Sequence, residues 1–241
     1  MKKLLIIYLI FPVFIFAITS EEILEKVDYN MTPSSIEYDG EMIIHKKNKK
    51  FIKKMKIQAV GKDLAFMEFV SPPRDKGTKY LRNGENLWIF LPKADRTVKI
   101  SGHMLRQNMM GSDISYEDQT DRSHLTDLYT SEILEETDKS FILELTAREG
   151  EDTAYYRRVI EVDRDNYVLI TSKMYAVSGK LLKEFYVDDA MWIGDRYYIT
   201  KFRMEDKIKE DSYTEIILNN IVIDPDIPES VFTLKNLERR N

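Results

Sequence analysis

Residues 167–187 read YVLITSKMYAVSGKLLKEFYV, and this stretch decides the predicted fold. Two runs rich in β-branched and aromatic residues, Tyr167–Val177 and Lys180–Val187, flank the pair Ser178-Gly179. Such runs on either side of a turn predict a β-hairpin. The two strands must be antiparallel, because a parallel pair needs a crossover of roughly a dozen residues or more.

The same pattern extends outward from this hairpin in both directions. The Asn83-Gly84 pair is a strong hairpin signal, and Gly61 marks another turn between alternating runs. The spacing leaves no room for crossover helices, so the sequence predicts a mainly β fold, an incomplete antiparallel β-barrel or curling sheet. The further strands expected are Met55–Ala59, Ala65–Phe69, Thr78–Arg82, Leu87–Leu91, Asp95–Ile100, Phe141–Arg148, Tyr155–Asp163, Tyr197–Met204 and Tyr213–Ile223.

Short helices are expected at both ends of this strand series. Thr19 and Glu22 have capping-box spacing, and Ile23 and Val27 follow at helical separation, which predicts a helix over Glu21–Tyr29. The segment Ile227–Phe232 predicts one closing helical turn. These short helices are expected to cover the sheet.

The segment Ser101–Leu134 does not alternate and is rich in Met, Asp, Ser and Thr. We expect a long loop here with one or two short helical turns. Long irregular segments inside compact domains usually carry a function or cover another part of the molecule.

The first residues indicate export. Lys2 and Lys3 precede an apolar run from Leu4 to Phe16, which ends at the small residue Ala17. This is typical of a secretory signal peptide over residues 1–17, and the run is shorter than the roughly 20 residues that span a bilayer. We expect cleavage after Ala17 and a single domain over residues 18–241. A retained inner-membrane anchor is the alternative.

Composition narrows the classes of function. The chain has no Cys, so it carries no lipobox cysteine and no disulfide, and its net charge of −5 argues against nucleic acid as a partner. Lysines between Lys46 and Lys54 lie in or beside a predicted hairpin, where solvated charge is expected to suppress edge-to-edge association.

Catalytic signatures are missing from the sequence. His45, His103 and His124 are dispersed and do not have the spacing of a zinc site, and no phosphate-binding loop or nucleophile elbow is found. We therefore expect no metal, no cofactor and no enzymatic activity. An enzyme acting on envelope lipids is the least favoured hypothesis.

Large, soft apolar side chains instead suggest a binding surface. Methionine adapts its shape to varied apolar ligands, and a curved sheet under thin cover leaves a concave face for them. The alternative is that these side chains simply fill the core at one end of the sheet. The candidates for a hydrophobic cavity wall are Met67, Phe69, Trp88, Phe90, Leu105, Met109 and Met110.

Three segments resemble the outer-membrane lipoprotein-sorting (LolA-like) family. They are residues 75–82, residues 87–92 and, above all, the Met-Gly-Ser-Asp-Ile-Ser-Tyr-Glu-Asp element at residues 110–118. The resemblance extends over about residues 36–237. It implies an incomplete antiparallel β-barrel, covered by helices, whose hydrophobic cavity shields lipoprotein acyl chains in the periplasm. Some relatives are thought to serve lipid-exporting pumps.

Residues of the Met-Gly-Ser-Asp element are expected to have structural roles. Gly111 is expected to adopt a positive φ that turns the segment back over the sheet, with Ser112 or Asp113 capping the next helical turn. Asp118 is expected to anchor the segment through backbone hydrogen bonds. Tyr116 belongs to the same element.

Two functional hypotheses follow. The first is a periplasmic carrier that binds acyl chains of lipoproteins or lipids and transports them toward the outer membrane, between an inner-membrane exporter and an outer-membrane acceptor. The alternative is a non-catalytic periplasmic module that docks on a lipid-exporting membrane pump without holding lipid.

Overall fold

The computed structural model describes residues 18–120, 122–209 and 211–239. The predicted signal peptide at residues 1–17 lies outside this part of the chain. Helix α1 (Ser20–Met31) begins at Thr19 with the expected capping box, in which the Thr19 side chain accepts from the Glu22 backbone N–H and the Glu22 carboxylate accepts from the Thr19 N–H. Its apolar stripe, including Ile23, Leu24 and Val27, is fully buried.

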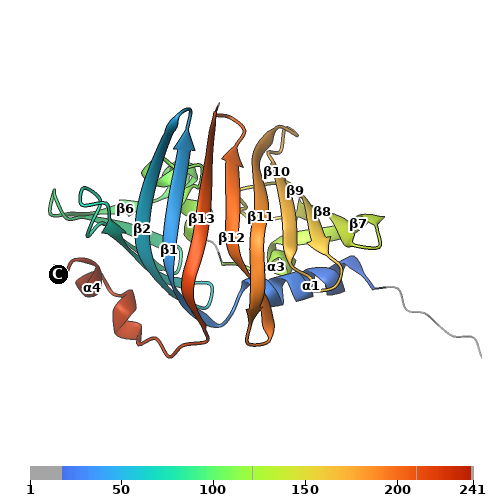
Figure 1. Cartoon of the computed structure of the whole chain (residues 1–241), viewed down its shortest axis with the longest axis horizontal. Helices are drawn as coiled ribbons and strands as arrows, with labels where there is room; N and C mark the ends of the chain where they lie inside the picture. Colours follow the sequence, from blue (N-terminus) through green and yellow to red (C-terminus); the bar gives the residue numbers. More distant parts are fainter. Residues whose placement is uncertain (1–17, 121, 210, 240–241) are drawn as a thin grey trace, which may run out of the picture.

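In the described part of the chain, thirteen strands form one antiparallel sheet, in the order β6-β5-β4-β3-β2-β1-β13-β12-β11-β10-β9-β8-β7 (Figure 1). Strands that pair in the sheet are consecutive in the chain, except that β1 pairs with β13, and the consecutive strands β6 and β7 lie at opposite edges. The strands are β1 (Ser35–Lys46), β2 (Lys49–Val60), β3 (Leu64–Ser71), β4 (Lys79–Asn83), β5 (Asn86–Leu91), β6 (Arg96–Ile100), β7 (Tyr129–Glu136), β8 (Ser140–Ala147), β9 (Arg157–Asp163), β10 (Leu169–Tyr175), β11 (Leu181–Ile193), β12 (Arg196–Asp206) and β13 (Ser212–Ile223).

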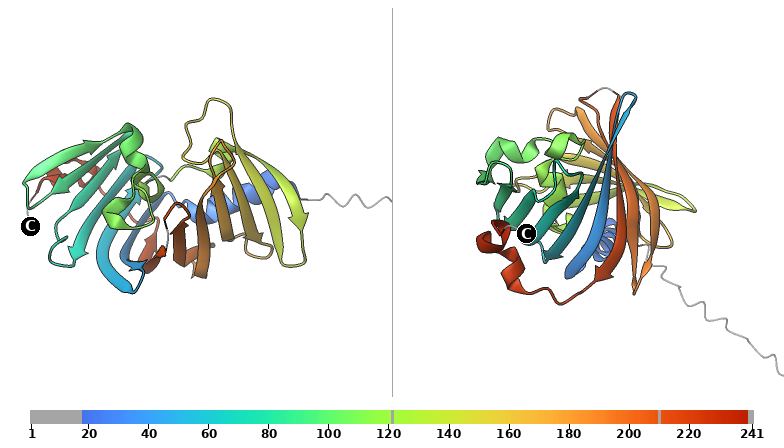
Figure 2. Two further views of the ribbon diagram at one scale, coloured as in Figure 1. Left: turned by 90° about the horizontal axis from the view of Figure 1, so that it is seen from above. Right: turned by 60° about the vertical axis from the view of Figure 1, so that its left-hand side comes forward.

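The sheet curves but does not close, since β6 and β7 are its two edges. The mainly β fold and the incomplete barrel predicted from the sequence are thus confirmed. Seen from above, the two flanks of the sheet bend around α1 and the irregular segment between β6 and β7 (Figure 2). We call this segment, residues 101–128, the insertion.

The described residues of the insertion form four short helical elements: η1 (Gly102–Arg106), η2 (Met109–Gly111), α2 (Tyr116–Thr120) and α3 (Leu125–Leu128). It is shorter than expected, because β7 begins at Tyr129. Tyr129 is the one buried residue of β7, and the remaining side chains of this edge strand are half-buried or exposed. Such a strand shows little of the apolar alternation that sequence reasoning needs.

Two hydrophobic clusters lie beneath these covers on the concave face. α1 packs with α3 and strands β7 to β10, where Leu143, Leu145 and Val162 are fully buried. The insertion packs over β1 to β6 and β13, in a cluster that includes Met42, Met55 and Phe69. The concave face is therefore covered by two different segments.

The convex face of β3 to β5 has its own cover, at the C-terminal end of the described chain. The 3-10 helix η3 (Glu229–Phe232) and α4 (Leu234–Leu237) bring Phe232 and Leu237 against this face (Figure 1). Strands β3 to β5 are consequently buried on both faces.

The lysines between Lys46 and Lys54 do not protect an edge of the sheet. They lie on β1 and β2, which are inner strands, and Lys53 is buried and ion-paired with Asp75. The expectation of a solvated edge is therefore wrong for this hairpin. In the described part of the chain, every helix is too short or too polar to span a membrane.

Candidate functional site: two apolar cavities beneath the covers

An apolar cavity of about 240 Å³ lies on the concave face, between α1, the insertion and the sheet. We call it the inner cavity. Ala59 on β2 and Ala65 on β3 are paired directly across the two strands, and both line it. Small side chains at paired positions leave room that larger residues would fill. The inner cavity is also lined by Asn30, Met31, Ile36, Tyr38, Ile57, Ile114, Asp118, Gln119, Arg122, Phe185, Tyr197, Tyr198, Ile199, Phe202, Met204 and Leu218.

A second cavity of about 160 Å³ adjoins the first, and we call it the middle cavity. The two share four lining residues, Met31, Asp118, Phe185 and Met204. Leu125, Leu169 and Met174 make much of the remaining wall apolar. Together the cavities fall in the lower part of the volume range of small-ligand sites, roughly 300–1,000 Å³.

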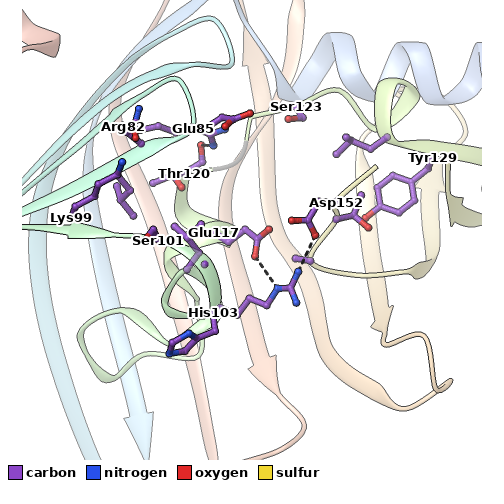
Figure 3. A pocket seen from close by; sticks show the side chains of 18 of the residues that line it. Arg82, Glu85, Lys99, Ser101, His103, Glu117, Thr120, Ser123, Tyr129 and Asp152 are labelled. Carbon is purple, nitrogen blue, oxygen red and sulfur yellow. Dashed lines mark hydrogen bonds and ion pairs between the residues drawn. The ribbon is translucent and has the colours of Figure 1, made fainter. Parts of the chain in front are cut away.

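A wider pocket of about 780 Å³ opens between the two edges of the sheet, and we call it the outer pocket (Figure 3). One side is formed from β4 to β6, and the other from β7, β9 and the loop before β9. Most of the residues that line it are polar or charged. Arg106 crosses the opening, with Nη2 3.1 Å from an Asp152 carboxylate oxygen and Nε 3.7 Å from Glu117. Glu117, Ser123, Leu128, Ala154 and Arg158 also line the middle cavity.

The Met-Gly-Ser-Asp element forms a tight turn that fastens the insertion to β13. Met110 and Gly111 have φ values of 52° and 80°, and a side chain at position 111 would be strained in this conformation. The Asp113 carboxylate is fully buried and accepts hydrogen bonds from Ser212 Oγ at 2.6 Å and Thr214 Oγ1 at 2.7 Å. Ser112 closes the turn by donating to the Met109 carbonyl at 2.7 Å.

Asp118 fastens the other end of this element to β11, at the boundary of the inner and middle cavities. Its carboxylate pairs with the buried Lys183 and accepts from Tyr155 Oη at 2.6 Å. It also accepts from the Ser115 N–H at 2.8 Å, while the Ser115 hydroxyl accepts from the Asp118 N–H at 3.1 Å. Ser115, rather than Ser112 or Asp113, is therefore the cap of α2.

Electrostatics keep Asp118 ionised despite its burial. Burial alone raises the pKa of this carboxyl. Lys183 and the hydrogen bonds from Tyr155 and Ser115 lower it by more than burial raises it, so the pKa lies below its usual value. Burial, reinforced by the Asp118 charge, raises the pKa of Tyr155 well above its usual value. Tyr155 thus remains a neutral hydrogen-bond donor.

The structure divides the seven proposed wall residues between two faces of the sheet. Met67, Phe69 and Met109 are buried in the concave cluster under the insertion, with Leu105 and Met110 packed against it. Trp88 and Phe90 instead lie on the convex face, against the C-terminal segment. Leu87 and Ile89 take the concave positions in that strand, so the expected grouping of all seven residues is corrected.

The inner and middle cavities are lined by residues that sequence reasoning did not select. Of the seven candidates, Leu105 lines the outer pocket, and the described walls of the two apolar cavities contain none. Phe185, Phe202 and Met204 sit on predicted strands, but their face could not be assigned from the sequence. The Ala59 and Ala65 pair flanking the Gly61 turn is a sequence signal that could have indicated free space.

Among the described residues, no group of three His, Cys, Asp or Glu side chains is placed to hold a metal ion. His45 stacks on Tyr213 and contacts Glu215 at 2.8 Å, on the β1–β13 pair. Both contacts join β1 to β13, so they stabilise the pairing of these two strands.

Comparisons with known proteins agree with this architecture. Residues 61–239 match the model of a family described as "Uncharacterized protein". No curated protein sequence matches the chain. A crystal structure of a DUF1329 family protein from Desulfovibrio piger is 25% identical, with a TM-score of 0.81 over 90% of this chain and 97% of that one.

Two further crystal structures resemble the chain over its length. A LolA superfamily protein from Nitrosomonas europaea is 22% identical, with a TM-score of 0.77 over 91% of this chain and 100% of that one. A domain assigned to outer-membrane lipoprotein sorting, from Vibrio parahaemolyticus, is 20% identical, with a TM-score of 0.79 over 91% and 98%. The chain thus belongs to the family whose model matches residues 61–239, and its fold is LolA-like.

Proposed function

We propose that this chain is a periplasmic carrier that holds acyl chains of lipoproteins or lipids and passes them toward the outer membrane. The observation that carries the proposal is the pair of adjoining apolar cavities between the sheet, α1 and the insertion. A buried methylene contributes about 0.8 kcal/mol, so apolar space of this kind can retain an acyl chain without any reaction.

Several further features support the carrier proposal. The outer pocket adjoins the middle cavity and provides a polar opening next to the apolar interior, as an amphiphilic ligand requires. The run of residues 1–17 has the composition of a signal peptide. One structural relative is assigned to outer-membrane lipoprotein sorting. The proposed role is transport, without a catalytic step.

Filling the inner cavity tests the proposal. Ala65 is half-buried and lines this cavity, so Ala65→Phe should occupy the space that a ligand would take. We expect the variant to fold and to lose at least tenfold in affinity for a fluorescent fatty acid, measured by fluorescence titration. Ala190→Phe is the matched control, because Ala190 lies on β11 outside the described walls of the cavities.

Native mass spectrometry of the protein from periplasmic extracts provides the second readout, because a carrier should retain lipid or an acylated peptide. An empty wild-type protein that also takes up no fluorescent fatty acid would refute the carrier proposal. If such a protein still co-purified with a membrane exporter, the docking-module alternative would stand in its place.

A further inference from the structure

Arg122 places a guanidinium group in the wall of the inner cavity. It lies in the insertion, between α2 and α3. Its Nη2 donates to the Pro33 carbonyl at 2.7 Å, which ties the insertion to the connection between α1 and β1. Its Nη1 is buried, and no hydrogen-bond partner for it exists in the part of the chain that the structure describes. The hydrogen bond to Pro33 therefore satisfies Nη2 but leaves the Nη1 donor unsatisfied.

No carboxylate neutralises this cation within the described residues, because none of their ion pairs includes Arg122. The ionisable groups that influence the pKa of Arg122 are the phenols of Tyr198 and Tyr38. Burial raises the pKa of both phenols, so they are neutral. Burial lowers the pKa of Arg122 itself, although a guanidinium stays protonated at neutral pH. Asp118 also lines the inner cavity, but its carboxylate is already paired with Lys183.

An unpaired donor of this kind is costly in a carrier that binds only hydrocarbon. A buried N–H without a partner costs about 1–3 kcal/mol, and more when the group is charged. Guanidinium groups bind carboxylate and phosphate oxygens through charge-assisted hydrogen bonds. The surroundings of Nη1 therefore match an oxyanion better than they match an acyl tail.

We propose that the ligand is an anionic amphiphile, whose carboxylate or phosphate binds Arg122 beside Tyr38 and Tyr198 while its tail extends into the inner and middle cavities. This inference rests on the proposed carrier function and specifies its ligand class. The volumes of about 240 and 160 Å³ suit one acyl chain better than several. A neutral ester with the same tail would leave Nη1 unpaired.

Three probes with one tail length test this inference in the full chain: dodecanoate, methyl dodecanoate and dodecyl phosphate. Wild-type protein should bind at least one of the two acids about tenfold or more tightly than the methyl ester, measured by calorimetry below the critical micelle concentration. Arg122→Met should remove that difference, weakening the acid and leaving the ester within about twofold. The tighter of the two acids identifies the preferred oxyanion.

Arg74→Met is the matched control, because Arg74 is exposed on a loop away from the cavities. Equal wild-type affinity for acids and ester would overturn the inference and leave the carrier function intact. Wild-type protein that binds none of the three probes would overturn both. If Arg122→Met does not fold, the comparison of acids with ester on the wild type still decides the question.

Discussion

α1 and the insertion cover the two halves of one concave face, but different interactions hold them there. α1 places Ile23, Leu24 and Val27 in a fully buried aliphatic cluster, and its Asp28 accepts from the backbone N–H groups of Leu125 and Thr126 at 2.7 and 2.9 Å. The insertion relies on two buried carboxylates, one of which is paired with a buried lysine.

This difference indicates which cover is more easily released. Besides the Asp28 contacts, α1 is held by apolar packing that does not depend on pH, whereas the buried ion pair stabilises the insertion only while both partners keep their charges. The cavities lie where the two covers meet, since Met31 of α1 and Asp118 of the insertion line both of them. A carrier that loads from this junction would need one of the covers to move. The insertion is the cover held by a buried ion pair, which protonation of Asp118 would break.

Removing the lysine should produce the largest effect. Lys183→Met leaves the Asp118 carboxylate buried without a counter-charge, which costs about 3–5 kcal/mol in comparable cases. We expect a loss of that order in the free energy of unfolding, measured by urea denaturation. Lys180→Met, at an exposed position in the preceding turn, is the control and should change stability by less than about 0.5 kcal/mol.

The double variant Lys183→Met with Asp118→Asn separates the charge from the loss of contacts. It should recover part of the lost stability, because the uncompensated charge is gone. A Lys183→Met variant as stable as the wild type would show that the ion pair does not hold the insertion.

Acid should release the insertion before it releases α1. Burial raises the pKa of Asp118 in the folded protein, but Lys183 lowers it by more, so the folded pKa lies below its usual value. The stability that this depression contributes is complete above the unfolded pKa of about 3.9 and is lost as the pH falls through the folded pKa. Amide hydrogen exchange, corrected for intrinsic rates, should therefore rise below about pH 4 more in residues 112–118 than in α1.

The same measurement on Lys183→Met provides the contrast. Without the lysine, the Asp118 pKa should no longer be depressed, so the excess acid sensitivity of the insertion should disappear. Equal exchange in both covers of the wild-type protein at every pH would contradict the proposed difference between them.

Local signals in the sequence were sufficient for most of the sheet. Asn83-Gly84 and Gly61 predicted two hairpins that the structure contains, and the capping box at Thr19 predicted the start of α1. These features depend on residues close together in the chain. The pairing of β1 with β13, which joins the two halves of the sheet, has no local signal.

The faces of individual strands were harder to assign. In β5, Leu87 and Ile89 face the concave core while Trp88 and Phe90 face the C-terminal segment. Both sets are apolar, so alternation could not separate them, and Trp88 and Phe90 were placed on the wrong face. A strand buried on both sides loses the period of two that reveals its orientation.

Buried charges were the other feature that the sequence could not predict. Lys53 and Lys183 look like solvated lysines among many others, and their acidic partners are 22 and 65 residues away. Arg122 likewise has no local pattern that marks it as a cavity residue. The lack of alternation over residues 101–134 located the insertion, but the partners that hold it are set by the fold.

The α1 cover should respond to a smaller and more local change. Thr19→Ala removes the side chain that accepts from the Glu22 N–H at 3.2 Å and breaks the capping box. Loss of such a cap costs about 1 kcal/mol, and here hydrogen exchange should rise in the first turn of α1 without rising in the insertion. Thr19→Ser should retain most of the stability, and Glu25→Ala, on the exposed face of α1, should be nearly neutral. If Thr19→Ala loosened the insertion as well, the two covers would open as one unit and their separate anchoring would lose its meaning.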